Sequence, residues 1–173
     1  MSSASTKRAL KGPVAKVKAE EPSGHAVKKS GGGVVNFCVG RPSGKNAALA
    51  WTTSQLIDVI RAGLPVQQLK ILQTSLGVPM DRLVPMLGIS KATLHRRIAG
   101  GRLGPSESER VVRFARLMGK AVEVMESEDD ARQWLTSPQF GLGGAVPLEY
   151  AETEVGAREV EDLLGRIEYG VYS

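Results

Sequence analysis

The chain has 173 residues, enough for one medium domain or two small ones, and 42% of them are hydrophobic, which excludes a chain that is disordered throughout. Its single cysteine, Cys38, excludes an internal disulfide framework and a cysteine-rich zinc module. With only two histidines, His25 and His95, a multi-histidine metal site is excluded as well. No apolar run is long enough to cross a bilayer, and no apolar segment follows the basic N-terminus. We therefore expect a cytoplasmic protein with no membrane partner, no metal and no cofactor.

Charge is distributed unevenly along the chain. Residues 1–30 hold seven Lys or Arg and two acids, residues 31–110 hold ten and four, and residues 111–173 hold six and twelve. The basic part suits a polyanion, because lysines and arginines release condensed counterions from phosphates. The acidic part would be repelled by that polyanion and is expected to face another partner. The alternative is that both parts are ordinary solvated surfaces, and composition alone does not separate the two interpretations.

Residues 1–45 are predicted to be a disordered basic tail and linker. They are rich in Ser, Lys, Ala, Gly and Pro, lack periodic apolar positions, and include Gly31-Gly32-Gly33. Within them, Val34–Val39 is a short apolar stretch that forms either a strand-like arm or a loop.

From residue 54 onward, apolar residues recur at steps of three and four, so the predicted fold class is mainly α. Helices are expected over about 54–62, 65–76, 79–87 and 90–100, with Pro65 at the first position of the second and Ser90 as the N-cap of the fourth. Ser106 and Glu109 have capping-box spacing, which predicts the start of a long helix that reaches about Met125.

The remaining third of the chain is also predicted to be helical. Ser127 begins a helix that ends near Ser137, and residues 139–146 form a glycine-rich turn. A phosphate cradle at this turn is a weak alternative, because no strand precedes it. Pro147 opens a short helical turn, and Thr153 caps a last helix that extends to about residue 167.

Residues 80–98 have the pattern of a helix-turn-helix. Gly88 supplies the positive φ that the turn needs. Apolar residues that would lock the two helices lie on either side of it, at Leu83, Leu87, Ile89, Leu94 and Ile98. The outer face of the second helix would enter the major groove, and its polar and cationic residues are the candidate DNA contacts: Ser90, Lys91, Thr93, His95, Arg96 and Arg97.

The stretch L-G-I-S-K-A-T-L-H-R-R-I resembles the helix-turn-helix of Xre-like regulators, and it lies in a predicted domain of residues 46–105. Pro85, inside the first helix of the pair, departs from the pattern because proline removes a helical hydrogen bond. The competing interpretation is an ordinary helical hairpin with a basic surface.

Residues 106–173 carry the runs W-L-x-x-P, G-G-x-x-P-L, T-x-x-G and V-x-x-L-L-G-R-I-x-x-G-V in that order. Together they resemble the C-terminal toxin-binding domain of the Xre/MbcA/ParS antitoxins. The resemblance implies a small helical toxin-binding domain behind the helix-turn-helix DNA-binding domain. It implies an antitoxin of a type II toxin–antitoxin system that neutralises a RES-type, NAD-consuming toxin. It also implies that the protein binds operator DNA to repress its own operon, acting at the nucleoid.

The resemblance also implies which residues meet the toxin. They lie at the end of the last helix and in the C-terminal tail: Arg166, Glu168, Tyr169, Gly170, Val171, Tyr172 and Ser173. Tyrosines suit insertion into a concave pocket, since they bury a large area while losing little rotamer freedom. The alternative is a frayed terminus that touches its own domain.

Three functions compete at this point. The first is the antitoxin, expected to act as a homodimer on paired half-sites and in a larger assembly with its toxin. The second is a helix-turn-helix transcription factor whose C-terminal domain only dimerises or senses a ligand. An enzyme is the weakest of the three, because Cys38, His25 and His95 form no recognisable catalytic set.

Overall fold

The computed structural model describes residues 52–170. The predictions for the basic tail, for Val34–Val39 and for the last three residues therefore lie outside the described residues. Within 52–170 the chain is helical and contains no strand, which confirms the mainly α fold class. None of these helices is both long and apolar enough to cross a membrane. The elements are α2 (Thr53–Ala62), α3 (Gln67–Leu76), α4 (Met80–Met86), α5 (Lys91–Gly100), α6 (Pro105–Met125), α7 (Glu128–Thr136), η2 (Phe140–Leu142), α8 (Pro147–Tyr150) and α9 (Glu154–Glu168).

Hydroxyl side chains begin four of the helices. Thr52 caps α2 in a reciprocal arrangement, because its Oγ1 accepts from the Gln55 N–H while Gln55 Oε1 accepts from the Thr52 N–H. Ser90, Ser127 and Thr153 cap α5, α7 and α9 as predicted, each accepting from the backbone N–H three residues further on. Each cap satisfies an amide that has no partner within the helix and contributes about 1 kcal/mol.

The predicted start of α3 at Pro65 is wrong. The helix begins at Gln67, and Pro65 instead forms an isolated antiparallel bridge with Arg102. The bridge is accompanied by a hydrogen bond of 2.8 Å from the Leu103 N–H to the Leu64 carbonyl. This pairing joins segments nearly forty residues apart, so no local pattern in the sequence could have indicated it.

The predicted capping box of α6 is wrong by two residues, since the N-cap is Gly104 and not Ser106. The helix begins at Pro105, which places Ser106 inside its first turn, and both Ser106 and Glu109 are exposed. Glu107 takes the capping role, because its Oε2 accepts from the Gly104 N–H at 2.6 Å. Proline at the first helical position costs no hydrogen bond, which explains why the helix starts there.

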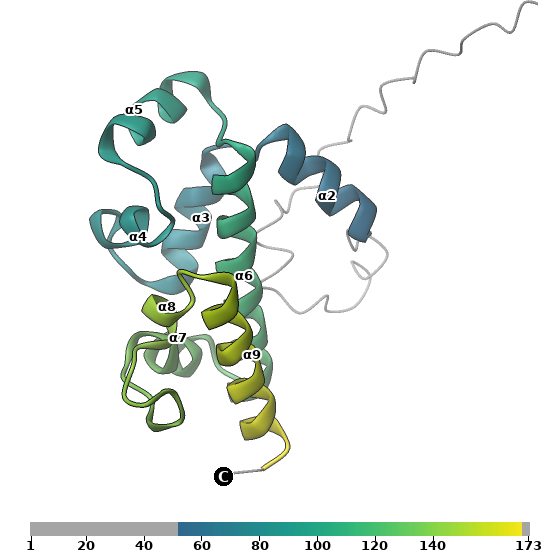
Figure 1. The fold of residues 1–173 in the computed structure, drawn as a ribbon, viewed down its shortest axis with the longest axis vertical. Helices are drawn as coiled ribbons and strands as arrows, with labels where there is room; N and C mark the ends of the chain where they lie inside the picture. The colour runs from purple at the N-terminus through teal and green to yellow at the C-terminus, as the bar shows by residue number, and fades with distance from the viewer. Residues whose placement is uncertain (1–51, 171–173) are drawn as a thin grey trace, which may run out of the picture.

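Helix α6 runs along the long axis of the molecule and forms its central support (Figure 1). It packs against α2, α3, α7 and α9, and its Phe114, Leu117 and Met118 are fully buried. Burying each side chain of this kind contributes about 1.5–3 kcal/mol. The buried side chains of the two halves of the chain form one continuous cluster around α6. The division into domains at residue 105 stays a prediction, since α6 serves both halves.

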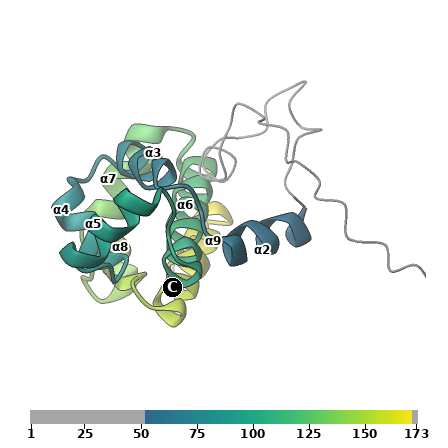
Figure 2. The same ribbon diagram turned by 90° about the horizontal axis from the view of Figure 1, so that it is seen from above.

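Seen along α6, the helices are arranged asymmetrically. Helices α3, α4, α5, α7 and α8 gather on one side of α6, while α2 projects on the other (Figure 2). None of the residues of α2 is buried. This helix is therefore held to the rest of the molecule by one face only.

Candidate functional site

The turn between α4 and α5 is held by a glycine and by an arginine of α6. Gly88 has φ +63°, and a Cβ at this position would lie 2.3 Å from Nη1 of Arg110. That nitrogen donates to the Leu87 carbonyl at 2.9 Å. Leu83, Leu87 and Ile89 are buried around the turn, as predicted. The two helices are thus fastened at a fixed angle, with the second one at the end of the molecule.

Three of the six predicted DNA contacts lie on the open face of α5. Lys91, His95 and Arg96 are exposed, and the 100° step of an α-helix places them within one broad stripe. None of the three forms an ion pair or side-chain hydrogen bond with another described residue. Their charge and hydrogen-bonding capacity are available to a ligand.

Of the other three, Ser90 is exposed while Thr93 and Arg97 are half-buried, and all three form hydrogen bonds within the fold. The Ser90 hydroxyl accepts from the Thr93 N–H and donates to the Thr93 hydroxyl at 3.0 Å. Arg97 is half-buried, and its Nε donates to both carboxylate oxygens of Glu107 at 3.0 and 2.8 Å. Glu107 is only 8% exposed, so this pair fastens the end of α5 to the start of α6. DNA contact by these residues stays a prediction.

Ile98 does not lock α5 into the core, contrary to the prediction. It is 57% exposed, and with the half-buried Leu94 it borders an apolar groove of about 320 Å³ against α3 and Met80. No residue of α5 is buried. Helix α5 is therefore held in position by the turn at Gly88, by the half-buried Leu94 and by the Arg97–Glu107 pair.

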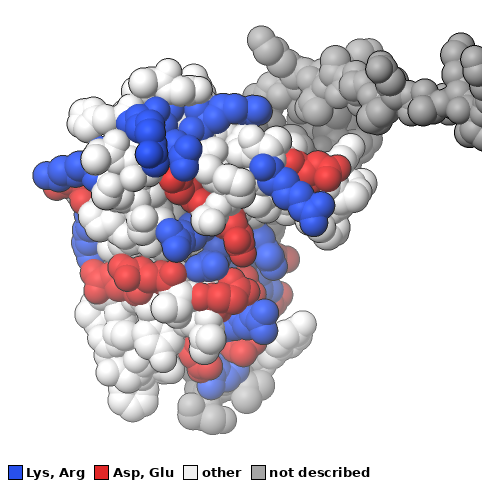
Figure 3. Space-filling model, turned by 45° about the horizontal axis from the view of Figure 1, so that its top comes forward, with Lys and Arg blue, Asp and Glu red and all other residues white. Residues whose placement is uncertain are grey.

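Basic side chains collect at the end of the molecule that carries α5 (Figure 3). Between Thr52 and Gly104 the chain holds seven Lys or Arg and two Asp. Further along the molecule, blue and red side chains alternate in the same view. The charge asymmetry of the sequence thus corresponds to a basic end on the folded surface, which suits a phosphate backbone.

The predicted toxin-facing segment begins where α9 is fastened to α6. Lys120 Nζ lies 2.5 Å from Glu168 Oε2, and this hydrogen bond, together with the charge of Glu168, raises the pKa of Lys120. Arg166 pairs with Glu159 at 3.3 Å on the surface of α9. Directly after this anchor Tyr169 is 79% exposed, although its backbone N–H still donates to the Gly165 carbonyl at 3.1 Å, and Gly170 has φ +66°. Val171, Tyr172 and Ser173 lie outside the described residues.

An exposed aromatic residue that the sequence did not predict as a site lies near α9. Phe140 is fully exposed at the tip of a turn whose ends are joined by a 3.0 Å hydrogen bond from Gln139 N–H to the Ala145 carbonyl. The turn packs on α9, since a Cβ on Gly141 would lie 2.6 Å from Leu163. The glycines around Phe140 signalled the turn, but nothing local indicated that the ring faces solvent.

The described residues contain no group of three or more His, Cys, Asp or Glu side chains that could hold a metal ion. The exposed candidate site residues lie on two surfaces, the open face of α5 and the exposed end of α9.

Both surfaces lie in segments of the chain that match known protein families. Residues 55–116 match the antitoxin Xre-like helix-turn-helix domain, and residues 120–170 match the antitoxin Xre/MbcA/ParS C-terminal toxin-binding domain. An antitoxin Xre of Yersinia enterocolitica is 38% identical over 120 residues, covering 68% of this chain and 81% of the relative. The chain belongs to the Xre/MbcA/ParS family of antitoxins.

Two further relatives of this antitoxin have comparable coverage. An antitoxin Xre of Photorhabdus laumondii is 35% identical over 117 residues, covering 66% of this chain and 79% of the relative. A protein of a Sphingobium strain named Prs ADP-ribosylating antitoxin is 29% identical over 127 residues, covering 68% and 80%. The matched domains of the antitoxin meet inside α6, the helix that both halves share.

Proposed function

We propose that this antitoxin neutralises a RES-type, NAD-consuming toxin by inserting its C-terminal tail into the toxin's active site. The observation that carries the proposal is the exposed aromatic side chain that directly follows the anchored end of α9. Glu168 is tied to Lys120, while Tyr169 directly after it is 79% exposed. A fixed helix end followed by an exposed aromatic side chain presents a ready anchor for a concave pocket, because little freedom is lost on binding.

Two further observations support a protein partner at this end. The fully exposed Phe140 adds an apolar ring on a turn that packs against α9. The name of the Sphingobium relative refers to ADP-ribosylation, a reaction in which NAD⁺ is the ADP-ribose donor. A toxin that consumes NAD⁺ has a cavity for this dinucleotide, and an inserted tail would occupy it.

The second part of the proposal concerns DNA. The antitoxin binds its operator through Lys91, His95 and Arg96 of α5 and represses its own operon in the cytoplasm, at the nucleoid. Arginine and lysine bridge guanine or neutralise phosphates, and both suit a helix in the major groove. A homodimer would place two such helices on paired half-sites, and toxin binding would extend it into a larger assembly. Both activities are binding, and neither requires the antitoxin to act as an enzyme.

The alternative is a transcription factor whose C-terminal domain only dimerises or senses a ligand. Co-expression with a RES-type toxin separates the two functions. The full chain is expected to restore growth and cellular NAD⁺, and a chain that ends at Glu168 is expected to restore neither. Both proteins should retain operator binding, because α5 lies at the opposite end of the molecule (Figure 1).

A truncated chain that still protects cells would contradict the tail mechanism. A full chain that binds the operator but neither captures the toxin nor restores NAD⁺ would favour the transcription factor. Phe140→Ala, which leaves the tail intact, is expected to weaken toxin capture less than the truncation does.

A further inference from the structure

Helix α9 contains a glycine that its own fold does not require. Gly165 lies inside the helix, four residues before the C-cap Tyr169, and its φ is not positive. A Cβ at this position would meet no atom of the described residues within 4 Å, apart from the adjoining backbone of its own helix. Glycine is unfavourable in a helix, because it loses more backbone freedom on folding than any other residue. Neither the backbone conformation nor packing within residues 52–170 therefore explains a glycine here.

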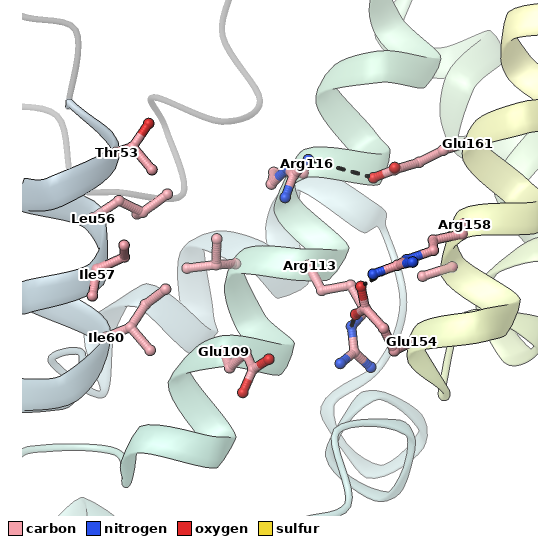
Figure 4. A pocket seen from close by; sticks show the side chains of 12 residues that line it. Thr53, Leu56, Ile57, Ile60, Glu109, Arg113, Arg116, Glu154, Arg158 and Glu161 are labelled. Carbon is pink, nitrogen blue, oxygen red and sulfur yellow. Dashed lines mark hydrogen bonds and ion pairs between the residues drawn. The ribbon is translucent and has the colours of Figure 1, made fainter.

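The acidic side chains beside Gly165 are held toward α6. On a helix surface, the neighbours of a residue are those three and four positions away. Glu168 lies 2.5 Å from Lys120, and Glu161 lies 3.9 Å from Arg116. Figure 4 shows Glu161 reaching from α9 toward Arg116, at the edge of a groove of about 410 Å³. These contacts agree with the open space at the Cβ position of Gly165, because both acids are engaged to one side of it.

The other side of Gly165 belongs to an open stripe along α9. Val155 and Tyr169 are 80% and 79% exposed, and Asp162 is exposed between them. Gly165 follows Asp162 by three residues and precedes Tyr169 by four, so the 100° step of an α-helix places these residues along one side. Helix α9 packs on α6, α8 and η2 through its buried side. The glycine thus leaves the helix backbone bare in the middle of an exposed surface.

We propose that a backbone segment of the toxin crosses α9 at Gly165, in direct contact with the backbone of the helix. Residues 120–170 match a toxin-binding domain, so α9 belongs to the part of the chain whose family partner is a toxin. Glycine allows another chain to approach a backbone more closely than any residue with a Cβ does. Such an approach explains why an unfavourable residue occupies this place in the helix.

This contact deepens the proposed neutralisation of the toxin and rests on it. Tyr169 lies one helical turn beyond Gly165, so the crossing point is continuous with the tail that we propose enters the active site. The two parts have different roles. The tail occludes the active site, whereas Gly165 fixes where the body of the toxin lies on α9.

The test compares two glycines that both have open space at the Cβ position, Gly165 in α9 and Gly100 at the end of α5. A RES-type toxin is immobilised, and its capture of full-length variants is measured by biolayer interferometry, alongside thermal unfolding. Gly165→Ala is expected to raise the unfolding temperature by about 2–4 °C, because alanine favours a helix, and nevertheless to raise the dissociation constant. Gly165→Gln, which also introduces a good helix former, should raise the dissociation constant by about tenfold or more, since its longer side chain fills the crossing point.

The Gly100→Ala and Gly100→Gln variants are the matched controls. They should leave toxin capture unchanged, because α5 and the end of α9 lie at opposite ends of the molecule (Figure 1). Weaker capture by a more stable protein is a result that damage to the fold does not produce.

A Gly165→Gln variant that captures the toxin as tightly as the wild type would overturn the inference, and so would equal losses in the Gly100 variants. A lower unfolding temperature of Gly165→Ala would show that the fold itself needs the glycine, which also overturns it. A wild type that captures no toxin contradicts the proposed function itself. A wild type that captures the toxin, beside Gly165 variants that do so equally well, contradicts only the placement of the toxin on α9.

Discussion

Gly88 and Gly143 both adopt left-handed backbone conformations, with φ of +63° and +65°, but their surroundings differ. A Cβ at Gly143 would meet open space, whereas one at Gly88 would meet the Arg110 guanidinium that donates to Leu87. Alanine at either position costs about 1–2 kcal/mol for the left-handed conformation. We expect Gly88→Ala to reduce the free energy of unfolding by about 1 kcal/mol more than Gly143→Ala, because Arg110 must give up its hydrogen bond. Urea unfolding measures both, and equal reductions would argue against a role of Arg110 in holding the turn.

Lys91 and Arg96 are exposed cations on α5 that are expected to neutralise DNA phosphates. Replacing Lys91 and Arg96 by alanine should weaken operator binding and flatten the dependence of log K on log salt, by about one unit for each phosphate that is no longer neutralised. Fluorescence anisotropy at several salt concentrations measures the slope. Arg166→Ala removes one positive charge at the far end of α9 and should leave the slope unchanged. An unaltered affinity of the double variant would mean that α5 is not the recognition helix.

At the scale of elements, α9 is fastened to α6 by Lys120 and Glu168. The pKa of Lys120 is raised above its ordinary value of 10.5 by its hydrogen bond to Glu168 and by the nearby negative charges. A raised pKa means that the folded state holds the proton more tightly than the unfolded state. The stabilisation is therefore complete below pH 10.5 and disappears as the pH rises through the higher folded-state value.

Because the stabilisation by Lys120 disappears at high pH, the difference in unfolding temperature between the wild type and Lys120→Met should depend on pH. The wild type should have the higher unfolding temperature at neutral pH, and the difference should shrink above pH 10.5. Thermal unfolding followed by circular dichroism at increasing pH measures it. A difference that stays constant over this range would show that Lys120 acts through packing of its aliphatic chain instead.

The helix N-caps show what residue spacing in the sequence can and cannot predict. Ser90, Ser127 and Thr153 cap their helices as predicted, because an N-cap is a contact between residues three apart. Ser106 had the same spacing from Glu109 but lies inside α6. There Glu107 occupies the cap, since it is also the ion-pair partner of Arg97.

At the scale of the whole molecule, residues 52–170 form one continuous core around α6. Removing residues 1–33 is therefore expected to change neither the unfolding temperature nor toxin neutralisation. Calorimetry and the growth assay measure the two effects. A large fall in the unfolding temperature would show that the N-terminal segment contributes to the fold.

The sequence by itself determined the helical fold class, the turn at Gly88 and the family, since helical periodicity, glycine at positive φ and motif order are all local or linear properties. Only the tertiary structure decided which residues of α5 are free. Arg96 and Arg97 are neighbours of identical type, yet one faces solvent and the other binds Glu107. It also revealed the exposed face of α2, because whether an apolar stripe is covered depends on which helices lie across from it. Helical periodicity indicates which side of a helix is apolar, but whether another element covers that side is decided by tertiary packing.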